Sequence, residues 1–584
     1  MMDQKRLFLA IAISVVILFG SQLLFPPAKR PVAPAAQTTS QPLPGTASKS
    51  SNTLGGASQD AALAPVPTPA NTPRLKVNGP RVEGTISLVG ARIDDLVLRD
   101  YRETLAKNSP LVRVLEPRAD SHPYYADFGW TGAGVKLPDS ATVWTTTATE
   151  LSPGHPATLT WDNGQGQVFA LTFALDDDFM FTVQQGVRNG GSAAITVQPY
   201  QRIRRDYTPA VGGYYILHEG LVGVIDGKLE EVKYAAAKSA GDKADGVAFT
   251  GDTTGGWAGI TDKYWLVALV PTQGAPSIAT YRHTLNEAAT GTPVDGYQVD
   301  YTEPATTIAP AADATGTSRL FAGAKEVHLL DRYQTSLHIT DFWKAVDFGW
   351  FSLITRPFFY GIDWLYHLTG NFGIAILIFT FGLKLLFLPL ANKSYRSMSK
   401  MKLLGPKMTE LRAQYKEEPQ KLQSAMMGLY KAEKVNPASG CLPMLIQIPV
   451  FFSLYKVIFV TIEMRQAPFF GWIHDLSAVD PTNVFNLFGL LPFDPSALLP
   501  LLHLGAWPLI MGASMFFQQK MNPPPPDPMQ ARLFQFMPLI FMFMLARFPA
   551  GLVIYWSWNN TLTIGQQWLI QRSTRLAKPA LARV

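Results

Sequence analysis

The stretch Phe372–Ala391, FGIAILIFTFGLKLLFLPLA, decides the class of this protein. An α-helix of about 20 apolar residues is long enough to cross a lipid bilayer, so we predict a membrane span here. Its single charge, Lys384, would cost about 2.5–3.5 kcal/mol at the centre of such a helix. This lysine either extends to the cytoplasmic headgroups or faces a water-filled cavity inside a helix bundle, with Thr380 on the same helix face.

Further apolar segments predict a bundle of membrane helices. Four of them follow the opening stretch: Cys441–Val460, Leu499–Phe517, Leu533–Leu545 and Leu552–Ile570. The last two are separated by a short turn at 547–551 and would form a tight hairpin. Another apolar segment lies within residues 1–25, where 19 uncharged residues come after Lys5 and Arg6. This pattern fits a retained anchor or a cleaved signal peptide. With the anchor, the sequence predicts six membrane spans.

The distribution of basic residues predicts the orientation in the membrane. Residues 392–436 contain ten Lys or Arg against four Glu, and the tail after Gln571 contains four Lys or Arg and no acid. Because cytoplasmic loops carry an excess of Lys and Arg, we place this loop and both chain termini in the cytoplasm. The large region between the anchor and the five later helices then lies on the opposite side.

Upstream of the helices the sequence predicts a β-domain. Residues 26–73 are rich in Pro, Ala, Ser and Thr and fit a flexible linker. Residues 74–340 contain short alternating runs, including two predicted strands in 158–173, joined by an Asp-Asn-Gly turn, and two more in 257–270. The alternation in 81–90 places one set of residues on a single face: Val82, Gly84, Ile86 and Leu88. A large antiparallel β-sandwich is the expected architecture.

The remaining boundaries follow from composition. Residues 341–370 are rich in Trp, Phe and Tyr with scattered charges, which is typical of an interfacial amphipathic helix. Residues 371–575 form the predicted core of five membrane helices, and this core includes a cytoplasmic helical hairpin at 392–436. A basic tail, 576–584, ends the chain.

Polar residues inside the predicted spans indicate a hydrophilic site. Four residues of the last span are spaced to share one helix face: Trp556, Asn560, Thr563 and Gln567. Tyr555 lies beside them, and Gln447 adds a polar group to another span. These groups either hydrogen-bond between helices and hold the bundle together or line a polar concavity together with Lys384.

The basic loop carries two apolar stripes. Met408, Leu411 and Tyr415 form one stripe, and a second follows in the next predicted helix: Leu422, Met426 and Leu429. Two amphipathic helices packed as an antiparallel hairpin would bury these stripes against each other. The basic exterior is then either a solvated surface or a docking arm for anionic lipid, ribosomal RNA or a nascent chain.

A second lysine, Lys456, lies near the outer end of its predicted span. Glu463 follows seven residues later on the same helix face. We expect Lys456 to pair with that carboxylate or to extend outward to the headgroups.

The sequence contains no pattern typical of catalysis or of metal binding. A single cysteine, Cys441, excludes an intramolecular disulfide and a four-cysteine metal site. The nine histidines show no metal-ligand spacing, and neither a phosphate-binding glycine loop nor a nucleophile motif is present. We therefore predict a protein that is not an enzyme and uses no cofactor.

Three segments resemble the YidC family of membrane protein insertases: NPASGCLPMLIQIPVFFSLYKV (436–457), RQAPFFGWIHDLS (465–477) and FPAGLVIYW (548–556). The resemblance covers the whole chain and implies a bacterial inner-membrane protein with a periplasmic, mutarotase-like β-sandwich. It also implies a five-helix core that encloses a hydrophilic groove, open to the cytoplasm and to lipid but closed to the periplasm.

The resemblance assigns roles to individual residues. The positive groove residue of the family, usually arginine, corresponds to Lys384, which keeps the charge but loses the planar donor fork. The substrate-contacting positions correspond to Thr380, Tyr555 and Trp556, where Trp556 replaces a frequent tyrosine. The implied partners are nascent membrane proteins, the Sec translocon, the ribosome and the signal recognition particle pathway.

The leading hypothesis is membrane protein insertion through a hydrated, positively charged intramembrane groove lined by Lys384, Thr380, Gln447, Tyr555, Trp556 and Asn560. A membrane-anchored periplasmic carbohydrate-active enzyme is an alternative, and it requires convergent carboxylates or His/Glu pairs in a cleft of the β-domain. A small-solute transporter would show internal repeats between its helices, and we find none in this sequence.

Overall fold

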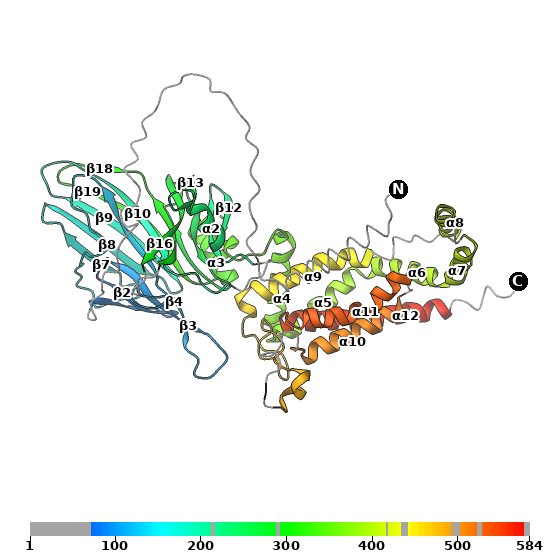
Figure 1. The fold of residues 1–584 in the computed structure, drawn as a ribbon. Helices are drawn as coiled ribbons and strands as arrows, with labels where there is room; N and C mark the ends of the chain where they lie inside the picture. The colour runs from blue at the N-terminus through cyan, green and yellow to red at the C-terminus, as the bar shows by residue number, and fades with distance from the viewer. Residues whose placement is uncertain are drawn as a thin grey trace, which may run out of the picture. The chain divides into compact units, whose positions relative to one another are not determined.

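A computed structural model describes residues 72–576 apart from 212–216, 288–292, 416–417, 434–441, 492, 494–502 and 523–527 (Figure 1). The predicted N-terminal anchor, nearly all of the predicted linker and the basic tail from 577 lie outside the described residues. Parts of the predicted third core span and of the motif that begins at Asn436 do so as well.

Strands make up the N-terminal half of the described chain. Those of the larger sheet are β1 (Arg74–Asn78), β2 (Val82–Ser87), β3 (Arg92–Arg102), β4 (Leu111–Leu115), β5 (Tyr124–Gly132), β6 (Glu150–Leu151), β10 (Ile195–Arg205), β13 (Val247–Thr253), β16 (Ser277–Glu287), β17 (Pro293–Thr302) and β18 (Thr306–Ile308). Those of the smaller sheet are β7 (Ala157–Asp162), β8 (Gln167–Leu175), β9 (Met180–Asn189), β11 (Gly220–Ile225), β12 (Lys228–Lys233), β14 (Trp257–Thr261), β15 (Trp265–Val270) and β19 (Ala312–Ala324).

The two sheets confirm the predicted β-sandwich. The larger sheet has the order β13-β16-β17-β10-β5-β3-β2-β1-β6, with β4 and β18 at its sides, and the smaller has the order β12-β11-β14-β15-β19-β9-β8-β7. Among the described strands, β1 and β6 form the one parallel pair. Strict alternation along β8, where every second residue is buried, places apolar side chains in the core because successive side chains point to opposite faces.

Most of the predicted strand positions are confirmed. β7 and β8 pair across the Asp162-Asn163-Gly164 turn, and β14 and β15 pair within 257–270. The prediction for 81–90 is partly wrong. Ile86 and Ser87 are both buried, while Gly84 and Leu88 are only half-buried. The pairing with β3 shifts register at this point: Thr85 pairs with Asp95 and Ile86 with Ile93, so Asp94 of β3 is the extra residue of a β-bulge.

Helices follow the β-domain. The short α2 (Tyr234–Gly241) lies within the domain, between β12 and β13, whereas α3 (Val327–Ser336) and the 3₁₀ turn η2 (Phe342–Ala345) come after its last strand. The predicted interfacial segment contains α4 (Ser352–Thr369), near whose start Trp350 and Leu353 are exposed. The core helices are α5 (Phe372–Leu386), α6 (Leu388–Leu403), α7 (Gly405–Gln414), α8 (Pro419–Ala432), α9 (Leu442–Val460), α10 (Ala506–Met521), α11 (Pro528–Leu545) and α12 (Ala550–Leu576).

Helix length and hydropathy identify one membrane-spanning candidate within the described chain. No single described helix is both long enough and apolar enough to cross a bilayer. The bent pair Phe372–Leu386 and Leu388–Met398 meets both criteria together, with 67° between its two parts. The apolar stretches Leu445–Val460 and Ala531–Leu545 are shorter.

The opening stretch of sequence is therefore two helices rather than one. The break lies at Phe387, two residues before Pro389. A proline disfavours the helical conformation of the residue before it, and its ring clashes with the carbonyl four residues back. The predicted span Phe372–Ala391 is thus broken three residues beyond Lys384, and its first part meets the criteria for a span only together with the beginning of α6.

The basic loop between α6 and α9 contains the predicted helical hairpin, formed by α7 and α8. The buried residues at its centre are Leu404 and Tyr430, and Met408 and Met426 pack against them. The Tyr430 hydroxyl also contacts the Met408 sulfur at 3.7 Å. Both apolar stripes thus contribute to the contact, but Leu404 and Tyr430 were not among the residues predicted for it.

The predicted partner of Lys456 is wrong. Its ammonium group lies 2.8 Å from the Asp347 carboxylate and donates a hydrogen bond to the Asp347 backbone carbonyl at 3.0 Å. The helix ends at Val460, and the 3₁₀ turn η4 (Ile462–Met464) directs Glu463 elsewhere. Glu463 instead accepts a hydrogen bond from the backbone N–H of Val327, at the start of α3.

We expect the Glu463 carboxyl to make the free energy of unfolding of the protein depend on pH. Burial raises the pKa of its carboxyl to about 8, although the hydrogen bond from Val327 opposes the shift. The folded protein then binds this proton more tightly than the unfolded chain, so the free energy of unfolding falls as the pH rises from 4.5 to about 8. Thermal unfolding at a series of pH values should show this decline in the wild type and a weaker one in Glu463→Gln. Parallel pH profiles of the two proteins would contradict the assignment.

Candidate functional site

A cavity of about 470 Å³ lies among α5, α6, α9, α10, α11 and α12. All six residues predicted for the site line it: Thr380, Lys384, Gln447, Tyr555, Trp556 and Asn560. Thr563 and Gln567, predicted to share a helix face with Trp556 and Asn560, line it too. The helical spacing read from the sequence therefore places these side chains around one space.

Lys384 is the one formally charged residue among the described residues that line this cavity. Its ammonium group donates a hydrogen bond to the Thr563 hydroxyl oxygen at 2.8 Å. The Thr563 hydroxyl in turn donates to the Asn559 carbonyl at 2.7 Å, so Thr563 can only accept from Lys384. No carboxylate in the described chain lies within 4.0 Å of the ammonium group. Two of its three protons thus remain available to water or to an incoming acceptor.

Several cavity residues hold the helices together. Gln447 on α9 donates a hydrogen bond to the Tyr555 hydroxyl on α12 at 2.5 Å, and Asn560 donates to the Ser514 hydroxyl on α10 at 3.1 Å. The Thr380 hydroxyl donates to the Ile376 carbonyl of its own helix. Interhelical hydrogen bonding, one of the two roles predicted for the polar face, is thus confirmed for Gln447, Tyr555 and Asn560.

Other residues that line the cavity are aromatic or apolar. Trp556 is half-buried and forms edge-on contacts with Phe451 at 4.7 Å between ring centroids and tilted contacts with Phe541 at 5.7 Å. Met515 and Met537 also line the space. Methionine and aromatic side chains adapt to apolar partners of different shape.

Sequence reasoning missed several lining residues. Tyr395 on α6 and Asn522 beyond α10 face the cavity, and Asn522 accepts a hydrogen bond from Gln567 at 3.1 Å. The Tyr395 side chain is buried, although the residue lies in a basic stretch that we predicted to be a cytoplasmic loop. The one signal in the sequence is an aromatic residue among charged ones. Asn522 precedes a run of four prolines and carries no periodic signal.

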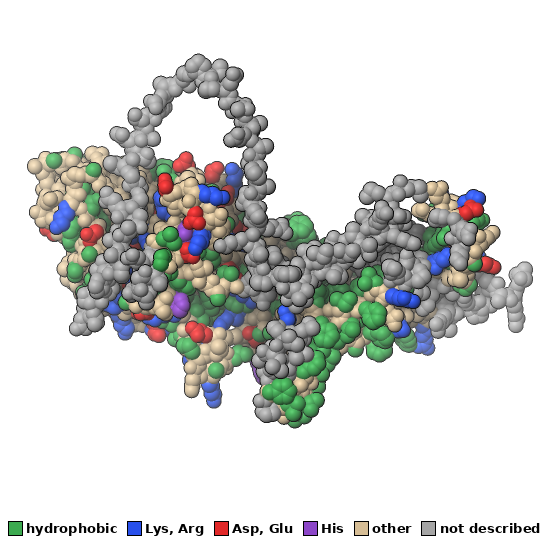
Figure 2. All heavy atoms as spheres, in the orientation of Figure 1, with side chains coloured by type: hydrophobic (Ala, Val, Ile, Leu, Met, Phe, Trp, Pro, Cys, Tyr) green, Lys and Arg blue, Asp and Glu red, His purple; other side chains and the backbone are tan. Residues whose placement is uncertain are grey.

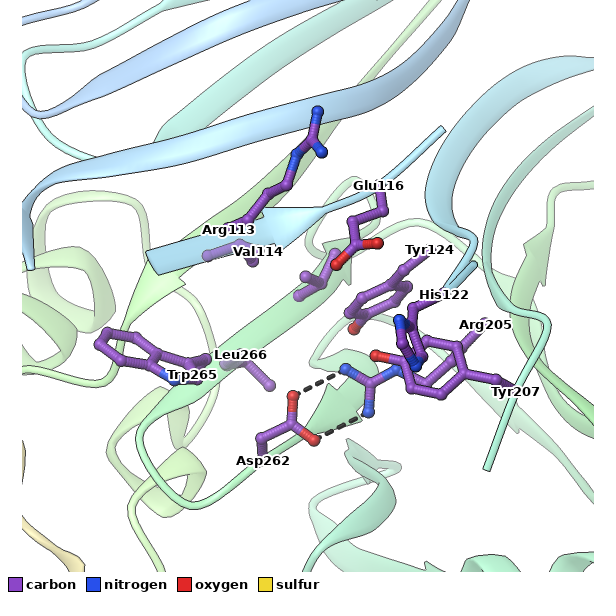
Figure 3. Close-up of a pocket in the computed structure, with 11 residues that line it drawn as sticks. Arg113, Val114, Glu116, His122, Tyr124, Arg205, Tyr207, Asp262, Trp265 and Leu266 are labelled. Carbon is purple, nitrogen blue, oxygen red and sulfur yellow. Dashed lines mark hydrogen bonds and ion pairs between the residues drawn. The ribbon is translucent and has the colours of Figure 1, made fainter. Parts of the chain in front are cut away.

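A second, smaller cavity lies in the β-domain, between the two sheets (Figure 3). Glu116 and His122 line it together with Asp262, which is the kind of grouping that the alternative enzymatic hypothesis requires. Asp262 is bound by both terminal nitrogens of Arg205, at 2.8 and 2.7 Å. The cavity measures about 70 Å³, far below the roughly 300 Å³ at which small-molecule pockets begin. This space is too small to hold a sugar, and its central ion pair joins the two sheets.

Two family models match adjoining parts of the chain. The family described as 60Kd inner membrane protein matches residues 364–578, which contain the larger cavity. The family described as YidC periplasmic domain matches residues 74–361, which contain the β-sandwich. Together they cover most of the sequence.

Known proteins match over nearly full length. A membrane protein insertase YidC from Granulibacter bethesdensis is 60% identical over 592 residues, which cover 100% of both chains. Another, from Acidiphilium cryptum, is 53% identical and covers 88% of this chain and 86% of its own. A crystal structure of an active YidC insertase is 18% identical, covers 85% of this chain and 94% of its own, and has a TM-score of 0.34. These relatives are insertases rather than enzymes, and the present chain belongs to the YidC family of membrane protein insertases.

Proposed function

We propose that this protein inserts nascent membrane proteins into the bacterial inner membrane, and that the cavity around Lys384 receives the polar part of each client. The observation that carries this proposal is an ammonium group with protons to spare in a cavity of about 470 Å³ among apolar helices. Moving a polar segment into lipid costs several kcal/mol for each unsatisfied polar group. A hydrated cavity part-way across the bilayer lowers that cost.

The apolar wall gives the client a second surface. The hydrophobic segment of a client would slide past Trp556, Phe451 and Met515 into lipid, and its burial would drive the step without ATP or another cofactor. In this arrangement the polar groups receive the tail of the client while the aromatic groups contact its future membrane helix.

The proposal includes a topology. It places the β-domain in the periplasm, both termini in the cytoplasm, and six spans in the membrane, counting the N-terminal anchor. The exposed basic residues of α6, Lys393, Arg396 and Lys400, support a cytoplasmic face that contacts anionic lipid and the ribosome. Family resemblance extends the partners to the Sec translocon and to chains delivered by the signal recognition particle.

Photocrosslinking tests the site directly. A photoreactive residue at Trp556 should crosslink to the membrane segment of a ribosome-stalled client, because this side chain borders the cavity. Trp568 is the matched control, since it is the same residue type on the same helix but is 53% exposed and lies outside the cavity. Equal crosslinking from both positions, or crosslinking from Trp568 alone, would reject the cavity as the client site.

A further inference from the structure

The connection between α9 and α10 carries a concentration of exposed apolar side chains. They extend from the 3₁₀ segment η5 (Val484–Gly489) to Phe493, and Figure 2 shows hydrophobic side chains gathered over this connection. Six of them are large and exposed: Phe485, Leu487, Phe488, Leu490, Leu491 and Phe493. Leu490 is 81% exposed. Surface patches of this kind on soluble proteins mark a site of contact with a partner or a membrane.

The backbone of this segment is built to display these side chains. Leu487, Phe488 and Gly489 have φ angles of 53°, 58° and 98°, in the left-handed region that bulky residues rarely adopt. Hydrogen bonds hold them there: Phe488 N–H donates to the Asn483 carbonyl at 2.8 Å, and Gly489 N–H donates to the Asn486 side chain at 2.9 Å. The exposure therefore results from a specific hydrogen-bonded conformation.

A buried carboxylate fixes the base of the segment. Asp480, which is 1% exposed, accepts hydrogen bonds from the Trp472 ring nitrogen at 3.1 Å, from the Thr482 hydroxyl at 2.7 Å and from the Trp507 backbone N–H at 2.8 Å. Trp507 belongs to the first turn of α10. The segment is thereby tied to the start of a helix that lines the large cavity.

Charge and position indicate which partner covers the patch. Residues 481–493 contain no charged side chain, so the patch offers nothing to an oppositely charged protein surface. Phe470 and Trp472, exposed on the adjacent loop, add aromatic rings of the kind enriched at membrane–water interfaces. In a family of membrane proteins, the apolar surface nearest to such a loop is the bilayer itself.

We propose that these six exposed side chains insert into the lipid leaflet on the side of the β-domain and anchor the α9–α10 connection at that interface. The inserted groups would reach the boundary between headgroups and acyl chains, as interfacial apolar segments do. This inference rests on membership of a membrane protein family and does not depend on the role of Lys384.

Site-specific fluorescence tests the insertion. Cys441 is the only cysteine in the sequence, so a Cys441→Ser background allows a single environment-sensitive fluorophore at Leu490→Cys. The full chain is reconstituted in vesicles of phosphatidylethanolamine and phosphatidylglycerol. We expect quenching by lipids that carry a spin label high on the acyl chain, and several-fold weaker quenching by aqueous iodide than for the control Leu285→Cys. Leu285 is a leucine of β16 that is 61% exposed.

A pair of matched variants separates insertion from local folding. Aspartate and asparagine both tolerate a positive φ, so Phe488→Asp and Phe488→Asn should keep the backbone while only the first adds a charge. With the fluorophore at position 490, Phe488→Asp should restore most of the access of iodide, and Phe488→Asn should restore little. Iodide access equal to that of position 285 would overturn the proposal. Protection from iodide without quenching by the labelled lipid would also overturn it, because a protein surface would then cover the patch.

Discussion

Vesicles that contain Lys384→Glu are expected to insert clients with acidic extracellular tails about tenfold more slowly than the wild type, or worse, because reversing the charge changes the interaction with a carboxylate at about 4 Å by several kcal/mol. Lys384→Ala should be impaired to a lesser degree, since it removes the attraction without adding repulsion. Lys384→Arg should retain insertion, since arginine keeps the positive charge. Protease protection of the client tail measures each rate.

The dependence on the client distinguishes this effect from a general loss of folding. Clients with neutral tails should be affected less than clients with acidic tails by every Lys384 substitution. Lys520→Glu is the matched control. It makes the same change of charge on α10, but Lys520 is exposed and does not line the cavity. Equal insertion by the Arg, Ala and Glu variants would rule out a role for the charge.

The second large effect concerns the ion pair between the sheets. Asp262→Ala is expected to lower the free energy of unfolding of the β-domain by about 3 kcal/mol, the low end for a buried pair, because the Arg205 guanidinium stays buried without its counter-charge while the Asp262 side chain is itself 27% exposed. The Arg205 side chain is 3% exposed and would retain only the Tyr234 hydroxyl as a hydrogen-bond acceptor, at 2.7 Å. The Tyr124 ring, 4.1 Å from the guanidinium carbon, would compensate in part. Thermal unfolding of the full chain, followed by the β-sheet signal in circular dichroism, measures the loss.

A double variant tests the cause of that loss. Combining Asp262→Ala with Arg205→Met removes both charges and should recover most of the stability, because an apolar replacement of a buried pair is often neutral. Arg113→Ala serves as a control. The Arg113 side chain is 39% exposed, and its ion pairs with Asp95 and Asp120 lie at the surface, so this substitution should change stability by less than about 1 kcal/mol. No recovery in the double variant would show that packing of the arginine stem, rather than its charge, stabilises the domain.

The sequence predicts the functional cavity well because the residues that line it lie at helical spacing. Trp556, Asn560, Thr563 and Gln567 are spaced by three and four residues, and any α-helix places them on one face. Lys384 and Thr380 follow the same rule on α5. The prediction needed no knowledge of how the helices pack, only that their polar faces turn inward, away from lipid.

Contacts between distant parts of the chain could not be predicted in this way. The partner of Lys456 lies 109 residues away, at Asp347, and the helical repeat that suggested Glu463 stops where α9 ends. Arg205 and Asp262 meet only because two sheets stack, and strand alternation says which face a residue occupies without saying what lies across the core. The bulge at Asp94 of β3, opposite Thr85 and Ile86 of β2, could not be predicted either, since a single added residue leaves no compositional mark.

The interruption of the helix at Phe387 has a mechanical consequence. The hairpin of α7 and α8 is connected through α6 to the break at Phe387. Lys384 lies in the last turn of α5, on the other side of this break. A force applied to the hairpin would therefore bend the chain first at this break. Such a force would tilt α6 before it disturbs the helices on the other side of the break, and would move the cavity residues of α6 while Lys384 keeps its position.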